Sequence, residues 1–314
     1  MFNALIHRLT DAGLLLVIVS LLAFGLTVLS PRHPEVHRLG ADAPASAVQE
    51  MRRSLGLEQP LPIQYAQWAG KALHGDLGRS YVTDQPVTSE ILARAPRTLS
   101  MIALAMLIAC ILGLTLGIVA SIHLQTWVSR LVAGFTGLTQ AVPSFWLGIL
   151  LVTVFALVLG WLPATGYVSP SVSVSGWLRS ILLPAVALGL PSTAAIARQL
   201  RSAMIGALGE EYVKTALAQG FTRTHVALHH ALRNAMGPAI TIIGFQVVVK
   251  LSTVVVVERV FAIDGLGNLA LDAVFRGDTP MLLGCVMTFA VVVLGVNLLV
   301  DLAYAWVSPK SRTS

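Results

Sequence analysis

The chain has 314 residues, of which 55% are hydrophobic and 11% are charged, and its mean hydropathy is +0.78. A soluble domain carries about 25% charged residues, so this composition excludes a soluble globular protein and indicates one that resides in a bilayer. The net charge of +6 does not indicate nucleic-acid binding, because multi-pass membrane proteins gather basic residues in their cytoplasmic loops. The two cysteines, Cys110 and Cys285, lie in apolar segments, which excludes a disulfide framework and a cysteine metal site.

The first apolar segment, residues 9–29, is long enough to cross a bilayer core, which takes about 20 residues. It lacks the short core and the cleavage site of a signal peptide, so we expect an uncleaved first transmembrane helix. The hydrophilic segment 30–98 follows, and we expect one extracytoplasmic insertion with a helix over residues 45–55. Gly75, Asp76 and Gly78 predict a tight turn in it, with Asp76 as a turn former rather than a catalytic acid.

Five further apolar segments predict five more transmembrane helices, at residues 99–122, 131–159, 181–203, 239–257 and 281–306. The second contains Gly113-x-x-x-Gly117, a pattern that lets helices approach closely. The third is over-long and interrupted by Pro143, which predicts a kink or the start of a new helix. The sequence therefore predicts an all-α membrane protein with six transmembrane helices.

Lysine and arginine counts in the short loops predict the orientation, because cytoplasmic loops carry the excess. Three arginines lie on one side, namely Arg179, Arg259 and Arg276. Nine basic residues lie on the side of the N-terminus, namely Arg8, Arg130, Arg198, Arg201, Lys214, Arg223, Arg233, Lys310 and Arg312. We therefore expect both termini and the loop 208–238 to be cytoplasmic, and segment 30–98 to be periplasmic or extracellular.

The loop 208–238 is the longest hydrophilic break in the C-terminal two thirds of the chain. Its first half has an apolar stripe at helical spacing, and a second amphipathic run extends over residues 222–236. Gly220 separates the two runs, and a residue without a Cβ can end one helix and turn the chain into the next. We predict a helix, a glycine corner and a helix. Such an element either docks on a soluble partner or lies on the lipid surface.

Three histidines in this loop, His225, His229 and His230, suggest a metal site because the first two are one helical turn apart. No carboxylate or cysteine lies close in the downstream run to complete such a site. We therefore interpret them as partly solvated residues near a partner surface and expect no metal there.

Motifs for the common hydrolytic chemistries are missing from the sequence. Gly70-Lys71 has no glycine five residues before Gly70, so the phosphate-binding loop pattern is absent, and no ABC signature sequence, serine elbow or HExxH motif occurs. We therefore expect no enzyme activity and no cofactor in this chain.

The loop sequence EYVKTALAQG, followed after nine residues by HALRNAMGP, closely resembles the cytoplasmic coupling loop of binding-protein-dependent ABC importer permeases. It is most similar to the dipeptide, oligopeptide and nickel branch of that family. Similar segments occur in the same order as in the family: LGL-x-x-PL-x-x-QY at 55–65, GDLG-x-S at 75–80, PV-x-x-x-I-x-x-R-x-P-x-TL at 86–99, PSFWL at 143–147, WLP at 161–163, ILLP at 181–184, GLG at 265–267, and Asn297 with Asp301.

The chain departs from the family pattern at three places. Pro31-Arg32-His33-Pro34 stands where the family has proline-glycine-aspartate-proline, and Asp264 stands where it has a proline before GLG. Ser308-Pro309-Lys310 replaces the closing aspartate-proline-arginine. These departures concern local loop shape and the substrate branch more than the transporter class.

The resemblance implies a type I ABC importer permease in the bacterial inner membrane. Its domains would be 1–29, 30–98, a permease core 99–307 that contains the coupling loop, and a cytoplasmic tail 308–314. The implied partners are a second homologous permease, two ATP-binding subunits that hold ATP and Mg, and an extracytoplasmic substrate-binding protein, for a substrate that is a peptide, nickel or a metal chelate. The residues implied in ATPase coupling are Lys214, Thr215, Ala216, Ala218, Gly220, Arg233, Asn234 and Pro238.

Lys250 is a basic residue well inside the predicted fifth helix, where the family has apolar residues and glycines along 250–253. Two interpretations remain: the ammonium snorkels to the outer headgroups, or Lys250, Ser252 and Thr253 line the translocation pathway and attract a carboxylate-bearing substrate. An ion-coupled secondary transporter and a polytopic membrane enzyme are the alternative functions. Neither internal repeats nor a catalytic pair within the apolar segments supports them.

Overall fold

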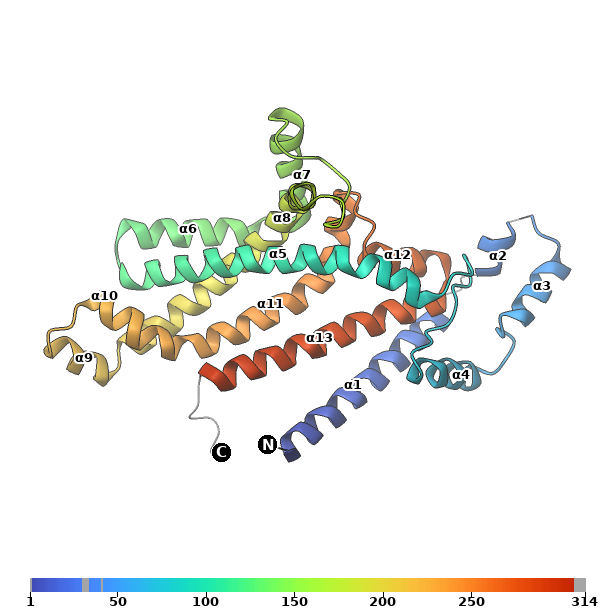
Figure 1. Cartoon of the computed structure of the whole chain (residues 1–314), viewed down its shortest axis with the longest axis horizontal. Coiled ribbons are helices and arrows are strands. Elements are labelled where there is room, and N and C mark those ends of the chain that lie inside the picture. Colours follow the sequence, from blue (N-terminus) through green and yellow to red (C-terminus); the bar gives the residue numbers. More distant parts are fainter. Residues whose placement is uncertain (1, 30–33, 41, 308–314) are drawn as a thin grey trace. The chain divides into compact units, whose positions relative to one another are not determined.

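The computed structural model describes residues 2–29, 34–40 and 42–307, so residues 31–33 of the first departure from the family pattern and the predicted tail at 308–314 lie outside it. Within these ranges the chain forms helices, and Arg79 and Pro86 make an isolated β-bridge. The helices, shown in Figure 1, are α1 (Phe2–Leu29), α2 (Pro34–Leu39), α3 (Ala45–Ser54), α4 (Leu61–Leu73), α5 (Val87–Ile122), α6 (Trp127–Ala141), α7 (Ser144–Leu151), α8 (Val174–Leu208), α9 (Glu211–Ala218), α10 (Arg223–Val226), α11 (Leu232–Val260), α12 (Leu266–Arg276) and α13 (Thr279–Val307), with π-helical segments η1 (Val152–Val158) after α7 and η2 (Ala227–Ala231) before α11.

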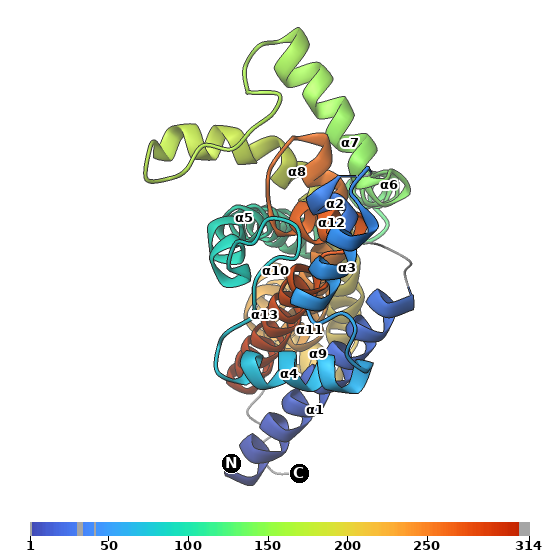
Figure 2. The same ribbon diagram turned by 90° about the vertical axis from the view of Figure 1, so that its right-hand side faces the viewer.

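Among the described residues, five helices are long and apolar enough to cross a membrane: α1, α5, α8, the continuous helix Arg223–Val260, and α13. A sixth span exists if α6 and the helix Ser144–Val158 count as one, although they meet at an angle of 99° (Figure 2). Pro143 stands just before α7, and Val142 is extended with ψ of 125°, as expected for a residue that precedes proline. The prediction that Pro143 begins a new helix is confirmed.

The chain divides into two compact units. The N-terminal unit comprises Met1–Thr98 with Asp264–Leu294, and the core unit comprises Leu99–Ile263 with Gly295–Ser314. The N-terminal unit thus combines the insertion with α12 and the first half of α13. Its apolar core joins the first turns of α5 to those helices, through Val87, Ile91, Leu266, Ala273, Met281 and Cys285.

Polar contacts fix the loops of the N-terminal unit. Asp76 accepts a hydrogen bond from the Gly78 N–H at 2.9 Å, and Gly75 and Gly78 have φ of 81° and 85°, which confirms the predicted turn. Arg94 donates to the Asp264 carboxylate at 2.9 Å, and Arg97 donates to it at 3.3 Å. Asp264, one of the departures from the family pattern, therefore ties the loop before α12 to α5.

Close helix packing holds the core unit together. A Cβ added at Gly113 would lie 2.8 Å from the Ile196 Cβ, and one added at Gly117 would lie 2.9 Å from the Ala197 carbonyl oxygen. Only glycine permits this approach between α5 and α8, so the close-packing role predicted for Gly113-x-x-x-Gly117 is confirmed.

Several predicted helix boundaries were too short. α5 begins 12 residues before Leu99, because Val87 and Ile91 bury an apolar face although Glu90 and Arg94 lower the hydropathy of that stretch. α8 extends over 174–208 rather than 181–203, since the Ser173 hydroxyl accepts a hydrogen bond from the Gly176 N–H and the two internal prolines do not end the helix. The helices α2, α4 and α12 were not predicted.

Candidate functional site

The loop 208–238 folds as the predicted helix, glycine corner and helix. Gly220 has φ of 91°, its N–H donates to the Leu217 carbonyl at 3.0 Å, and the Phe221 N–H donates to the Ala216 carbonyl at 3.3 Å. This pair of hydrogen bonds is the Schellman motif, in which a left-handed residue ends a helix and satisfies its last carbonyls. The Thr222 hydroxyl then caps α10 by accepting from the His225 N–H at 3.3 Å. The corner is therefore closed by backbone hydrogen bonds on the α9 side and by a side-chain cap on the α10 side.

A stripe of alanines attaches this corner to the rest of the core unit. Ala227, Ala231, Ala235 and Ala239 recur every four residues and pack against Leu200 and Met204 of α8. Small residues at this spacing let two helices lie close together. One continuous helix, made of α10, η2 and α11, thus packs against α8. Figure 1 shows α9 beside α10, at the N-terminal end of this helix.

A side-chain contact joins α9 to the same helix. The Asn234 amide donates to the Tyr212 hydroxyl at 3.0 Å, while Val213 and Val226 are buried at 3% and 0% exposure. Both sides of the corner are thereby tied to α11.

The eight residues predicted for ATPase coupling lie on the outside of this element. Lys214 is 70% exposed and pairs with Glu211 at 3.0 Å. Apart from half-buried Ala216, the coupling residues are exposed: Lys214, Thr215, Ala218, Gly220, Arg233, Asn234 and Pro238. Apolar side chains of the same region, including Leu217 and Phe221, are 42% and 45% exposed. The surface is thus available to a partner.

The three histidines form a ring stack rather than a convergent donor set. The rings of His225 and His229 are stacked with centroids 4.2 Å apart, and Phe221 stacks on His225 at 5.2 Å. His230 meets the His225 ring edge-on at 6.2 Å. Among the residues that the structure describes, no group of three histidine, cysteine, aspartate or glutamate side chains could hold a metal ion.

Lys250 lies inside the core unit, with 3% of its surface exposed. One turn earlier on α11, Gln246 accepts a hydrogen bond from the Ser192 hydroxyl of α8 at 2.9 Å. Residues four apart share a helix face, so Lys250 also faces α8. The Lys250 side chain is thus enclosed within the core unit.

The other two residues predicted for the pathway, Ser252 and Thr253, differ from Lys250 in exposure. Ser252 is exposed, and residues two apart on a helix are separated by about 200°. Thr253 is half-buried and donates to the Val249 carbonyl of its own helix at 3.2 Å. Thr253 follows Lys250 by three residues and is its neighbour on the surface of α11, whereas Ser252 faces another direction.

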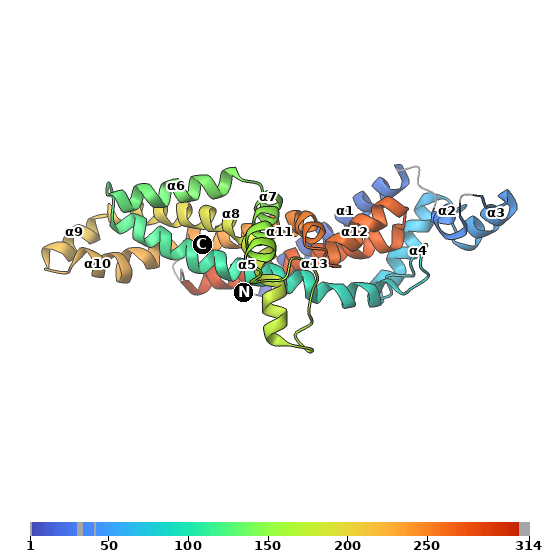
Figure 3. The same ribbon diagram turned by 90° about the horizontal axis from the view of Figure 1, so that it is seen from above.

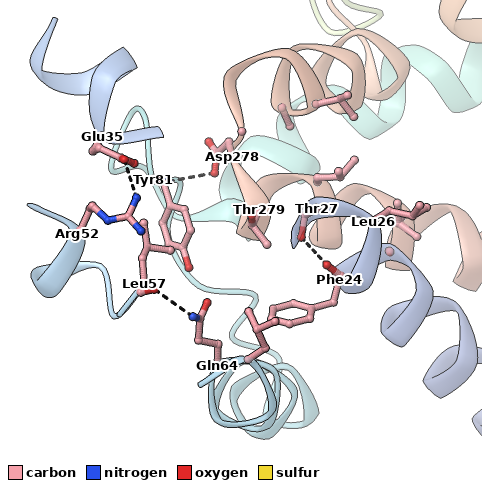
Figure 4. A pocket seen from close by; sticks show the side chains of 17 residues that line it. Phe24, Leu26, Thr27, Glu35, Arg52, Leu57, Gln64, Tyr81, Asp278 and Thr279 are labelled. Atoms are coloured by element: carbon pink, nitrogen blue, oxygen red, sulfur yellow. Dashed lines mark hydrogen bonds and ion pairs between the residues drawn. The ribbon is translucent and has the colours of Figure 1, made fainter. Parts of the chain in front are cut away.

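A cavity of about 480 Å³ lies in the N-terminal unit, and sequence reasoning did not predict it (Figure 4). One wall is apolar and comes from α1 and α13, with Phe24, Leu26, Leu282 and Val286. The opposite wall carries Arg52, which pairs with Glu35 at 2.9 Å although Glu35 is only 1% exposed. The cavity can therefore accept an apolar group with a polar end.

Tyr81 points its hydroxyl into this cavity (Figure 4). The Asp278 carboxylate holds it in place by accepting from the Tyr81 N–H at 3.0 Å and from the Ser80 hydroxyl. Burial raises the pKa of the Tyr81 phenol above its usual value, and the negative charge of Asp278 raises it further. Ser80 belongs to the GDLG-x-S segment, so this segment anchors the insertion to the start of α13.

Two family models together match nearly the whole chain. The binding-protein-dependent transport system inner membrane component matches residues 113–313, and the N-terminal model of the same system matches residues 1–102. The chain belongs to this family of importer permeases. This confirms the predicted recognition as an inner-membrane permease subunit of a binding-protein-dependent ABC importer, and with it a multi-pass location in that membrane.

Relatives of the permease are similar over their full length. It is 37% identical to a putative peptide transport system permease protein of Brucella melitensis, over 99% of both chains. It is 36% identical to a glutathione transport system permease protein of Escherichia coli O6:H1, again over 99% of both chains.

A chain of the MetNI methionine ABC transporter, solved in an inward-facing conformation, has a similar fold. The TM-score is 0.56 at 14% identity, covering 70% of the permease and 97% of that chain. At this identity the likeness concerns the fold, and it confirms the predicted type I importer permease architecture.

A signal for the missed helix α12 is present in the sequence. Leu266, Leu269, Ala270 and Ala273 repeat at helical spacing, and all belong to the apolar core or pack against it. Gly277 then ends the helix with φ of 69°, as glycine commonly does. The pattern is too short for a membrane span, and only a search for amphipathic helices outside the spans would have found it.

Proposed function

We propose that this permease forms half of the translocation pathway of an ATP-driven peptide importer. Family membership supports the importer class, and the names of its relatives support peptides, since glutathione is itself a tripeptide. Nickel and metal chelates remain rival cargoes of the same branch. Substrate reaches the permease from an extracytoplasmic binding protein, and the second half of the pathway is a related permease.

The proposed coupling element is the corner at Gly220, docked on a separate ATP-binding subunit in the cytoplasm. The observation that carries this proposal is that the outer surface of the loop is exposed while hydrogen bonds within the loop hold the corner in place. Exposed Lys214 and Arg233 can bind carboxylates of the partner, while the Schellman hydrogen bonds and the Asn234–Tyr212 contact keep the two helices in register. Closure of the ATPase would then move α9 and α11 as one body.

The proposed pathway role of Lys250, Ser252 and Thr253 depends on movement of α11. Lys250 makes no hydrogen bond or ion pair with another described residue through its ammonium, and an ionisable side chain within a membrane span marks a functional site by default. Because α8 covers it, Lys250 would meet a substrate carboxylate when α11 and α8 move apart during transport.

Reconstituted vesicles test the proposed function. The complete complex, two permeases with two ATPase subunits and the binding protein, is expected to accumulate radiolabelled di- and tripeptides when ATP is supplied to the face that carries the coupling loop. Vesicles that contain this chain alone should accumulate none. Uptake of nickel without uptake of peptide would assign the rival cargo, and ATP-dependent accumulation by the single chain would overturn the proposal.

A further inference from the structure

A small cavity between α6 and α8 is lined by two arginines. Its volume is about 140 Å³, several times the roughly 15 Å³ that one water molecule requires. α6 packs along α8 (Figure 3), and the cavity opens between them. The lining residues are Val132, Ala133, Thr136 and Gly137 of α6 with Ala197, Arg198 and Arg201 of α8.

The arginines bring two positive charges that the described residues do not balance. Neither Arg198 nor Arg201 forms an ion pair with a carboxylate in the part of the chain that the structure describes. The Arg201 Nε is buried without a hydrogen-bond partner, and its Nη2 makes one long contact of 3.4 Å to the Ser129 hydroxyl. A buried donor without an acceptor is costly, so an acceptor from outside the chain would stabilise this arrangement.

The surroundings of the cavity identify the kind of ligand that supplies this acceptor. Apart from the two arginines and Thr136, the lining is apolar and small, with Val132, Ala133 and Gly137 of α6 and Ala197 of α8. A hydrocarbon chain can therefore lie over these residues, between the two helices, with its polar end at the arginines. Basic pockets between membrane helices bind anionic headgroups in this way.

The position along α8 places the cavity near the coupling loop. Leu200 and Met204, from the same turns of α8, pack against Ala227 and Ala231 of the helix that follows the Gly220 corner. We propose that Arg198 and Arg201 bind the phosphate of an anionic phospholipid in the leaflet at the coupling-loop end. The bound lipid braces α6 against α8 beside the coupling element.

Native mass spectrometry of the purified complex tests the site. The probe is phosphatidylglycerol, with phosphatidylcholine of the same acyl chains as the reference. The parent complex should retain phosphatidylglycerol in preference, and the double variant Arg198→Gln/Arg201→Gln should bind it at least about tenfold more weakly, because charge-assisted hydrogen bonds are lost. Arg130→Gln is the matched control, since Arg130 is an exposed arginine on α6 that does not line the cavity, and it should bind like the parent.

Three results would overturn the proposal. Equal retention of phosphatidylglycerol and phosphatidylcholine by the parent would show that the two arginines do not select an anionic headgroup. Displacement of the lipid by inorganic phosphate would assign a soluble anion instead. Loss of the second permease from the double variant, with lipid binding intact in the remaining chains, would assign the arginines to a protein interface. The double variant Arg198→Lys/Arg201→Lys controls for misfolding, because it changes the same two positions but keeps both charges. It should bind phosphatidylglycerol more tightly than the glutamine double variant.

Discussion

The loop 208–238 and the N-terminal unit are both polar regions outside the apolar spans, but they use their polar groups differently. In the loop, Lys214 is 70% exposed and its partner Glu211 is 92% exposed. In the N-terminal unit, Asp278 is 5% exposed and Glu35 is 1% exposed, and each is bonded to another segment of that unit. The loop leaves its charges open to a partner, whereas the N-terminal unit uses its charges to hold itself together.

This difference has an energetic consequence. An exposed ion pair such as Lys214–Glu211 contributes about 0–1 kcal/mol, so the loop loses little stability when its surface changes. A buried carboxylate that accepts hydrogen bonds is costly to alter, since its donors are left unsatisfied. Substitutions in the loop should therefore change coupling, and substitutions at buried polar groups of the N-terminal unit should change stability.

The largest effect is expected for Gly220→Val. Gly220 has φ of 91° and open space around its Cβ position, so the cost comes from the backbone, roughly 1–3 kcal/mol for a residue with a Cβ in this region. The variant should insert and assemble, yet lose most substrate-stimulated ATP hydrolysis by the complex. Gly206→Val is the control, because Gly206 has open space and no positive φ. Full transport with unaltered hydrolysis by Gly220→Val would contradict the coupling role.

A several-fold effect is expected for Lys250→Met, which removes a buried charge that belongs to neither region. If the ammonium attracts a substrate carboxylate during transport, uptake of an anionic peptide relative to a neutral one should fall roughly three- to tenfold, or about 1 kcal/mol. Lys250→Arg should retain most of the preference. The measurement is the ratio of initial uptake rates in one vesicle preparation, and an unchanged ratio would exclude a contact with substrate.

The sequence predicted those features that local chemistry determines. The Gly220 corner, the Asp76 turn and the break at Pro143 follow from the backbone preferences of single residues, and all three are confirmed. The transporter class follows from motifs in the coupling loop and the insertion, and family membership confirms it.

The features that were missed depend on contacts distant in sequence. Asp278 bonds to Ser80 across 198 residues, and the cavity in the N-terminal unit is lined by residues as far apart in the sequence as Ala23 and Val286. The burial of Lys250 depends on how α8 covers α11, and hydropathy of the span does not reveal which of its faces is covered. Neither composition nor helical spacing contains this information.

A moderate loss of stability is expected for Asp278→Asn. The neutral amide weakens the bonds from the Tyr81 N–H and the Ser80 hydroxyl, at about 1–3 kcal/mol for hydrogen bonds to a charged group. Limited proteolysis should therefore cut the N-terminal unit faster. Asp84→Asn is the matched control, since Asp84 lies in the loop that contains Ser80 and Tyr81, its side chain is 54% exposed, and the variant should behave like the parent. Substrate stimulation of ATP hydrolysis should persist in both variants; its loss in Asp278→Asn would remove the distinction between the two regions.

The smallest effect concerns alkaline pH and Tyr81. Its pKa is raised by burial and by the charge of Asp278, so the folded protein keeps the phenol neutral where the unfolded chain, with a tyrosine pKa near 10, ionises it. This stabilisation is fully present below about pH 10 and is lost as the pH rises through the higher folded pKa. Between about pH 9 and about pH 11, Tyr81→Phe should therefore lose less stability than the parent. Asp278→Asn provides an independent measurement: with the negative charge removed, the ultraviolet titration of the Tyr81 phenol should shift to lower pH. A titration that does not move would assign the raised pKa to burial alone and would separate Tyr81 from the network of Asp278.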